Sequence, residues 1–430
     1  MSKNTVLLYS GLGHAYFHML TAFYFVIVLS LEVEWRLPYH QLVDLWTVGA
    51  LLVGVFAVVA GWLGDKWSAN GMLVVFFLGM GLSSIAAGFA AGPFALLLAL
   101  SGLGLFAAIY HPVGIPLVIR SSGANRGKAL AFNGVFGSFG AAMAGAVTGF
   151  LADRGGSFLA FVLPGAVVML TGVAMLIGLA RAQLAGARRE AGDGGDGDGG
   201  DGGDGGNPGN RGDAGDGDGG NPGNRGGRAN YRLPFFILMF CLTAAGLIYH
   251  ATQTVLPKAF SVRLGPALGT DLKTVGWYVM WVYIAGGLFQ FVGGALADRY
   301  DLKRVYLAQF VLHALLLTVA AQAGGAALVV VMCAAAAVGA GVLPAESMLV
   351  ARYTPNRHYG LVFGLKFLLF FGTGPVAVLL VSTVNRHTGQ FVWVFLSLAL
   401  VAAVICAAAL LLPRQPPFPA AVRRPAEVVV

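Results

Sequence analysis

Four histidines have the spacing of groups that could carry protons inside the protein. His14 and His18 are four positions apart, so in a helix their side chains project from one face, one turn apart. His250 follows His18 by 232 positions, and His111 lies in another apolar stretch. Histidine titrates near neutral pH, which suits proton exchange; the alternative is that each ring is only hydrogen-bonded in a packed core. No metal site is expected, because no carboxylate or thiolate accompanies the rings.

One acidic and one basic side chain also fall inside apolar stretches. Glu346 lies about five residues before the end of an expected helix at 326–350, and Lys366 about five residues into the next, at 361–383. At about 1.5 Å per residue, both lie about 7 Å inside the same boundary. Antiparallel neighbours would therefore bring them together, and an unpaired charge there would be costly. One interpretation is structural: the two residues form a fixed ion pair, or the lysine extends its ammonium to the membrane surface. The other interpretation is that they bind a proton or a solute.

Two copies of a short polar motif stand at the ends of long apolar stretches, 233 positions apart. The motif residues are Gly61, Asp65, Lys66, Gly294, Asp298, Arg299, Lys303 and Arg304. An aspartate at such a place can accept the free N–H groups at the start of a neighbouring helix, and the adjacent base can meet a carboxylate or a lipid headgroup. Contacts of this kind would hold one side of a bundle shut; the alternative is loop charge that only sets orientation.

A pair of prolines repeats with nearly the same spacing. Pro112 and Pro344 are 232 positions apart, and each precedes an arginine by eight positions. Each proline removes a backbone hydrogen bond, so bends are expected at both places, whether for gating or only for packing. The shared spacing of motifs and prolines predicts a duplicated chain with two similar halves.

Composition identifies the elements that position these residues. Hydrophobic residues make up 57% of the 430, charged residues only 11%, and the mean hydropathy is +0.76. Soluble domains carry about 25% charged residues, and the uncharged runs here approach the ~20 residues that cross a bilayer. The chain is therefore predicted to be an all-α polytopic membrane protein with twelve transmembrane helices in two six-helix pseudo-repeats. The spans are expected at 5–31, 41–62, 71–91, 94–118, 129–151, 158–180, 233–257, 274–296, 304–323, 326–350, 361–383 and 391–412.

Charge and composition also predict the domain boundaries and the sidedness. A Gly/Asp-rich stretch at 185–230 has almost nothing apolar to bury and is expected to be a disordered tether. It would separate bundles at 1–184 and 231–413, with a tail at 414–430. Most of the 27 lysines and arginines fall on the side of the termini, which predicts cytoplasmic N- and C-termini in a bacterial plasma (inner) membrane. The first apolar run is too long for a signal peptide and is expected to be retained.

The whole pattern resembles the major facilitator superfamily. The Gly-x-Leu-Gly-Asp-Lys loop after the second span, and its repeat after the eighth, are similar to the family's loop motif. The second copy continues to Lys303 and Arg304, whereas the first departs from the pattern at Ser68. The His111-Pro112 pair and the early His14 also resemble the fosmidomycin-resistance type of exporter, whose known members expel small drugs by proton exchange. The resemblance implies that spans 1, 4 and 7 line a central cavity, where all four histidines could meet.

These features together predict a secondary active transporter, a proton-coupled exporter of a small organic solute or drug. The alternatives are an importer of a small metabolite and a non-transporting receptor or assembly protein with the same fold. An enzyme or an ATP-driven pump is not expected, because the sequence has no nucleotide-binding loop, nucleophile elbow or Cys/His metal spacing. The expected partners are a small molecule, protons and lipid, with no cofactor and no nucleic acid, and the protein is expected to be a monomer.

Overall fold

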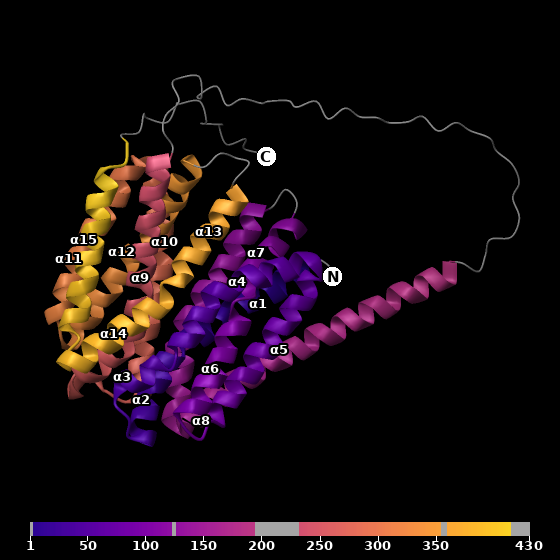
Figure 1. The fold of residues 1–430 in the computed structure, drawn as a ribbon, viewed down its shortest axis with the longest axis horizontal. Helices are drawn as coiled ribbons and strands as arrows, with labels where there is room; N and C mark the ends of the chain where they lie inside the picture. The colour runs from indigo at the N-terminus through magenta and orange to yellow at the C-terminus, as the bar shows by residue number, and fades with distance from the viewer. Residues whose placement is uncertain (1–2, 123–125, 194–231, 354–358, 414–430) are drawn as a thin grey trace, which may run out of the picture.

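A computed structural model describes residues 3–122, 126–193, 232–353 and 359–413, and within these ranges every element is helical. The first half contains α1 (Lys3–Ala22), α2 (Tyr24–Trp35), α3 (Tyr39–Asp44), α4 (Thr47–Lys66), α5 (Ala69–Gly88), α6 (Pro93–Ala107), α7 (Tyr110–Ser121) and α8 (Arg126–Asp193). The second half contains α9 (Arg232–Arg263), the 3₁₀ turn η3 (Pro266–Leu268), α10 (Leu272–Arg299), α11 (Leu302–Gln322), α12 (Gly325–Arg352), α13 (Tyr359–Gly372), α14 (Gly374–Thr388) and α15 (Val392–Leu410). Figure 1 shows the two halves side by side. The all-α fold is confirmed.

Helix α8 contains two of the expected spans in one element. Its apolar part covers 58 residues, and at about 1.5 Å per residue it would be ~87 Å long, far more than one bilayer crossing. The helix is broken at Gly155 and Gly156, and Gly156 has a φ of 64° that other residues rarely adopt. The Glu34 carboxylate accepts the Ser157 N–H at 2.7 Å and so caps the helix that restarts there. Among the described residues, eleven helices are long and apolar enough to span a membrane, and one of them is this double span.

The end of α8 differs from the expected domain boundary. The helix continues through residues 185–193, which were expected to begin the tether. The remaining part of the expected tether, 194–230, and the expected tail, 414–430, lie outside the described residues.

Four of the expected spans are interrupted once each. Between α1 and α2, α3 and α4, α6 and α7, and α13 and α14, the backbone stays near helical angles, but the hydrogen bonds tighten to three-residue steps. Pro112 follows the α6–α7 interruption by three residues, in agreement with the expected bend. Pro344 lies inside α12, which continues without interruption to Arg352, so the bend expected there stays a prediction. Pro344 has no backbone N–H, but the loss of this one hydrogen bond does not end the helix, because α12 is packed against neighbouring helices.

The two halves are joined at one end of the molecule. We call the end where Lys3 begins α1 and Leu410 ends α15 the proximal end, and the opposite end, which contains α3, the distal end. Four side chain-mediated hydrogen-bonded pairs join the halves at the distal end: Tyr39–Thr254, His40–Ser382, Glu32–Lys258 and Asp44–Arg386. Figure 1 shows α2 and α3 at this end, away from the N-terminus.

Glycines allow a close backbone contact between the halves. At Gly276 of α10, an added Cβ would lie 2.2 Å from the carbonyl oxygen of Gly145 in α8. At Gly149, it would lie 2.3 Å from the carbonyl oxygen of Leu272. Backbone therefore meets backbone here, the packing that small residues give to helices in lipid.

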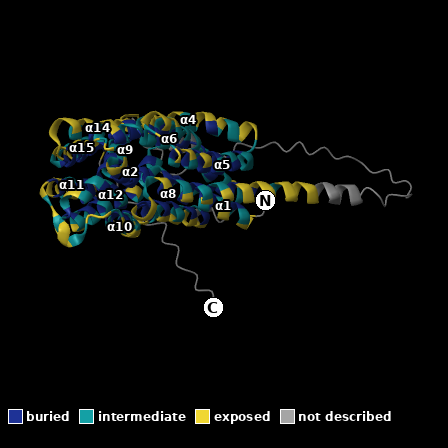
Figure 2. Ribbon diagram, turned by 90° about the horizontal axis from the view of Figure 1, so that it is seen from below, coloured by how far each residue is buried: buried dark blue, intermediate teal, exposed yellow. Residues whose placement is uncertain are grey.

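The outward faces are apolar, as a bilayer requires. Large hydrophobic side chains such as Leu170, Phe291 and Leu400 are exposed, whereas the buried residues lie between the helices (Figure 2). A water-soluble protein would hide such surface, but acyl chains solvate it. The membrane-spanning nature of the chain is confirmed.

Replacing Gly276 with alanine should loosen the distal closure. The new Cβ has no room against the Gly145 carbonyl, so α8 and α10 must separate. A cysteine-free background carrying Ser382→Cys, a buried distal position, reports the opening through its rate of maleimide labelling. We expect Gly276→Ala to accelerate labelling. Gly134→Ala, where the Cβ meets nothing within 4 Å, is the matched control, and equal rates in both would contradict the closure.

Candidate functional site

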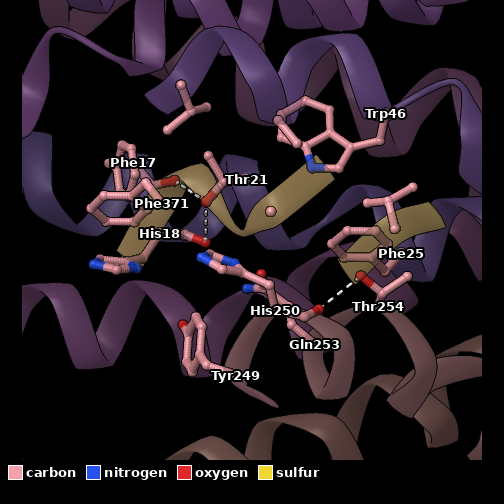
Figure 3. A pocket seen from close by; sticks show the side chains of 14 residues that line it. Phe17, His18, Thr21, Phe25, Trp46, Tyr249, His250, Gln253, Thr254 and Phe371 are labelled. Carbon is pink, nitrogen blue, oxygen red and sulfur yellow. Dashed lines mark hydrogen bonds between the residues drawn. The ribbon is translucent and has the colours of Figure 1, made fainter. Parts of the chain in front are cut away.

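A small cavity lies between the halves, beside three of the helix interruptions. Its wall includes Phe17, His18 and Trp46 from the first half and Tyr249, His250 and Phe371 from the second (Figure 3). Its volume is about 30 Å³, which is room for one or two water molecules. A larger solute can enter only if the halves move apart.

Three of the four histidines come together on the first-half side of this cavity. His14 and His18 project from α1, and their Nε2 atoms are 3.2 Å apart. His111 from α7 joins them, so that one ligand atom from each ring lies within 4.8 Å of the others. His250 stands on α9 in the opposite half, and it shares the cavity wall with His18 (Figure 3). The four histidines were expected to meet at one place. Instead, His14, His18 and His111 form one group, and His250 lies across the cavity from it.

The ring of His14 is held from two other helices. Its Nδ1 lies 2.8 Å from the Asn133 carbonyl oxygen of α8, and since that oxygen can only accept, Nδ1 carries the proton. The ring stacks on Tyr110 of α7, with centroids 5.0 Å apart. The Tyr110 hydroxyl lies 2.9 Å from the Asn133 side-chain oxygen and 2.8 Å from the Ser10 carbonyl, and it donates to one of them. Sequence analysis missed Asn133, although an amide in a glycine-rich apolar span was a usable signal.

Aromatic rings separate the group of three from the second half. Phe17 contacts His111 edge-on at 4.4 Å between centroids, and Phe371 of α13 reaches the same histidine at 4.7 Å. Phe371 also contacts His250 at 6.0 Å. A displacement of the C-terminal half would therefore alter the contacts of both His111 and His250.

Glu346 and Lys366 form an ion pair away from this cavity. Their charged atoms are 2.8 Å apart, as expected for residues at matching depth on α12 and α13. The side chains are 3% and 11% exposed, and Lys366 also donates to the Ser347 hydroxyl at 3.1 Å. Neither residue lines the central cavity. A nearly dry pair of this kind strands a charge whenever one partner is removed.

The motif aspartates do not cap neighbouring helices, contrary to expectation. Asp65 instead pairs with Arg120 at 2.8 Å, with both side chains exposed. Asp298 is exposed and makes no ion pair with any residue that the structure describes. The helix N-caps are formed by the residues three positions after each aspartate: Ser68 caps α5 and Asp301 caps α11. Only a residue at the N-cap position has a side chain that can reach the free backbone N–H groups of the first turn.

The basic residues of the motif have different surroundings. Lys303 donates to the carbonyl of Leu410, at 2.8 Å, and to that of Leu412, so it caps the end of α15. The backbone N–H of Arg304 donates to Asp301. Lys66 and Arg299 are exposed at the proximal end.

Two ion pairs across the halves were not anticipated. Lys258 of α9 donates to both carboxylate oxygens of Glu32 at 2.7–2.8 Å, and Arg386 of α14 lies 3.2 Å from Asp44. The partners are 226 and 342 positions apart, and no repeat spacing links them, so the sequence offered no signal.

Breaking the Glu346–Lys366 pair should destabilise the protein unless both charges are removed. Glu346→Gln leaves a buried ammonium without its partner, which costs about 3–5 kcal/mol of unfolding free energy. Adding Lys366→Met should restore most of the loss. Thermal unfolding of the detergent-solubilised protein measures both effects. The half-exposed distal pair is the control, and Arg386→Gln should cost no more than about 1 kcal/mol. A double variant as unstable as the single one would exclude a coupled pair.

Comparison with known proteins places the fold. The family model of the Major Facilitator Superfamily matches residues 11–265 and 235–428. A search of curated proteins finds no match. Among solved structures, the chain is similar to a bacterial homologue of the human lysosomal transporter Spinster, in an inward-facing and occupied conformation, with a TM-score of 0.71, 13% identity and coverage of 96% of this chain and 98% of that one. A D-xylose–proton symporter matches with a TM-score of 0.67, 15% identity and coverage of 94% and 97%.

A third similar structure is a peptide transporter in complex with sulfate, with a TM-score of 0.67, 14% identity and coverage of 95% of this chain and 96% of that one. At these identities, the likeness shows the fold alone. The narrower likeness to fosmidomycin-resistance exporters stays a prediction. Because the family model spans both halves, the chain belongs to the major facilitator superfamily, whose members are membrane carriers rather than enzymes.

Proposed function

We propose that this protein is a secondary active transporter that moves a small organic solute by alternating access. The observation that carries the proposal is the arrangement of the halves: four hydrogen-bonded pairs join them at the distal end, and a small cavity lined by groups from both halves, including His18 and His250, lies between them. Breaking the distal contacts while forming proximal ones would expose His18 and His250 alternately to the two sides of the membrane.

The proximal side is proposed to be cytoplasmic. Lysines and arginines concentrate there, and basic loops stay inside during membrane insertion. With this orientation the distal end faces outward across a bacterial plasma membrane, and the described conformation is closed to the outside.

Protons are the proposed coupling ion, with Glu346 as the carrier. Its carboxylate is nearly buried within a span and is neutralised by Lys366 at 2.8 Å. Protonation of Glu346 would leave the ammonium unpaired in a poorly solvated place, so α12 and α13 would have to rearrange. The free-energy cost of leaving the Lys366 ammonium unpaired would therefore couple proton binding at Glu346 to movement of α12 and α13.

Export of a small organic solute or drug is the proposed direction, on the basis of the resemblance around His111 and Pro112 to fosmidomycin-resistance exporters. Import of a small metabolite is the second candidate, favoured by the shared fold with a D-xylose–proton symporter. A receptor that does not transport would need no titratable pair inside a span, which argues against the third reading.

Drug susceptibility and proton flux test the function together. Expression in an efflux-deficient strain should raise resistance to at least one compound of a drug panel. Proteoliposomes given that compound should then show a pH change that depends on it. Glu346→Gln with Lys366→Met should fold but lose the flux, because the reacting carboxylate is gone. Full flux in that folded double variant would exclude Glu346 as the carrier, and flux without any pH change would exclude proton coupling.

The proximal motif should act on turnover rather than on stability. Asp65→Asn removes an exposed ion pair worth about 0.2–1 kcal/mol, so the unfolding temperature should hardly move. If Asp65 and Asp298 help to close the proximal side, Asp65→Asn and Asp298→Asn should each slow transport several-fold while leaving the membrane level unchanged. Transport in vesicles with equal amounts of protein measures this. Wild-type rates in both variants would refute a gating role.

A further inference from the structure

We infer that His14, His18 and His111 form a binding site for a divalent transition-metal ion of the zinc, cobalt, nickel or copper class. The inference goes beyond the proposed transport and does not depend on its direction or solute. It also departs from the sequence-based expectation of no metal site, which assumed that a carboxylate or thiolate was needed. Three imidazoles are the only protein ligands of zinc in some known catalytic sites, where a water molecule takes the fourth position.

The spacing of the ligand atoms fits such an ion. Metal–nitrogen bonds of about 2.0–2.1 Å in a tetrahedral site place two ligand atoms about 3.3 Å apart. The Nε2 atoms of His14 and His18 are 3.2 Å apart, and His111 has a nitrogen within 4.8 Å of both. For tetrahedral coordination, the His111 nitrogen must approach the other two to about 3.3 Å.

The supporting contacts are those of a metal ligand. His14 donates Nδ1–H to the Asn133 carbonyl at 2.8 Å, which leaves a lone pair on Nε2 directed toward His18. A second hydrogen bond of this type fixes the tautomer and the orientation of most metal-bound histidines. Gly137 of α8 leaves the space for this ring, because a Cβ there would lie 2.6 Å from the His14 Cε1 and 2.7 Å from its Nε2.

In the metal-free protein, one hydrogen bond between the Nε2 atoms can satisfy both rings, with His18 as the donor. Metal binding then requires the His18 proton to move from Nε2 to Nδ1, and the ion takes the place of that shared proton. No ring changes its charge in this exchange. The change is a tautomer shift, which a neutral imidazole permits.

The fold itself does not require the three histidines. With the 232-position offset of the repeat, His14 and His111 correspond to Gly246 and Leu343 in the second half, and only His18 keeps a histidine partner. His14 and His18 are incompletely buried, and His18 lines the cavity, so an ion that enters the cavity would meet the site. Three protein ligands leave a coordination position for water or a donor atom of a solute, as in open zinc sites.

Metal binding to the purified, tag-free, EDTA-treated protein tests the inference. Zn²⁺ titrated in a calorimeter should bind with a stoichiometry of one, and Co²⁺ should give the visible absorption bands of a four- or five-coordinate site. His14→Gln, His18→Gln and His111→Gln should each raise the Kd at least about tenfold. Gly137→Ala, which crowds the His14 ring without removing a ligand, should do the same.

Two matched controls separate this site from adventitious binding. His313→Gln removes a buried histidine of the second half, and Gly134→Ala adds a methyl to α8 where nothing lies within 4 Å; neither should change the Kd. Thermal unfolding checks that each variant is folded. Absence of the Co²⁺ bands in the wild type, or binding that survives all three folded His→Gln variants, would overturn the inference. These measurements need no transport, so their failure would leave the proposed function untouched.

Discussion

The backbone contact between α8 and α10 is the constraint on which the rest of the architecture depends. In lipid there is no hydrophobic drive to bring helices together, so the halves adhere where their surfaces fit most closely. Gly145, Gly149 and Gly276 remove the side chains that would keep the two helices apart. This contact lies in the distal part of the bundle. It therefore closes that side, and the central cavity sits beneath the closure.

The ion pairs at the distal end depend on this closure. Glu32 and Lys258 can meet only because α2 and α9 are already held together, and both side chains are about one-fifth exposed. Partly hydrated pairs contribute modest attraction and break at modest cost. A conformational change needs contacts of this kind, whereas a fully buried pair between the halves would resist separation.

The two halves have similar helices but bury different polar groups. The first half buries a neutral network around His14, while the second buries the Glu346–Lys366 ion pair. Under the repeat offset, Glu346 and Lys366 correspond to Gly114 and Gly134. In both places the polar groups satisfy one another, because an unpartnered charge or polar atom is expensive inside a bilayer.

The sequence by itself determined the helical class, the two halves, the pairing of Glu346 with Lys366 and the shared face of His14 and His18. The two halves follow from motifs that repeat 232–233 positions apart. The other features follow from short-range periodicity, from the length of apolar runs or from the depth of a residue along a helix. Tertiary structure decided what the motif aspartates contact: Asp65 reaches Arg120 on another helix, while Ser68 makes the cap. It also decided that Asn133 orients His14 and that Lys258 meets Glu32. Such contacts depend on how helices from distant parts of the chain rotate and approach, and no local pattern records that geometry.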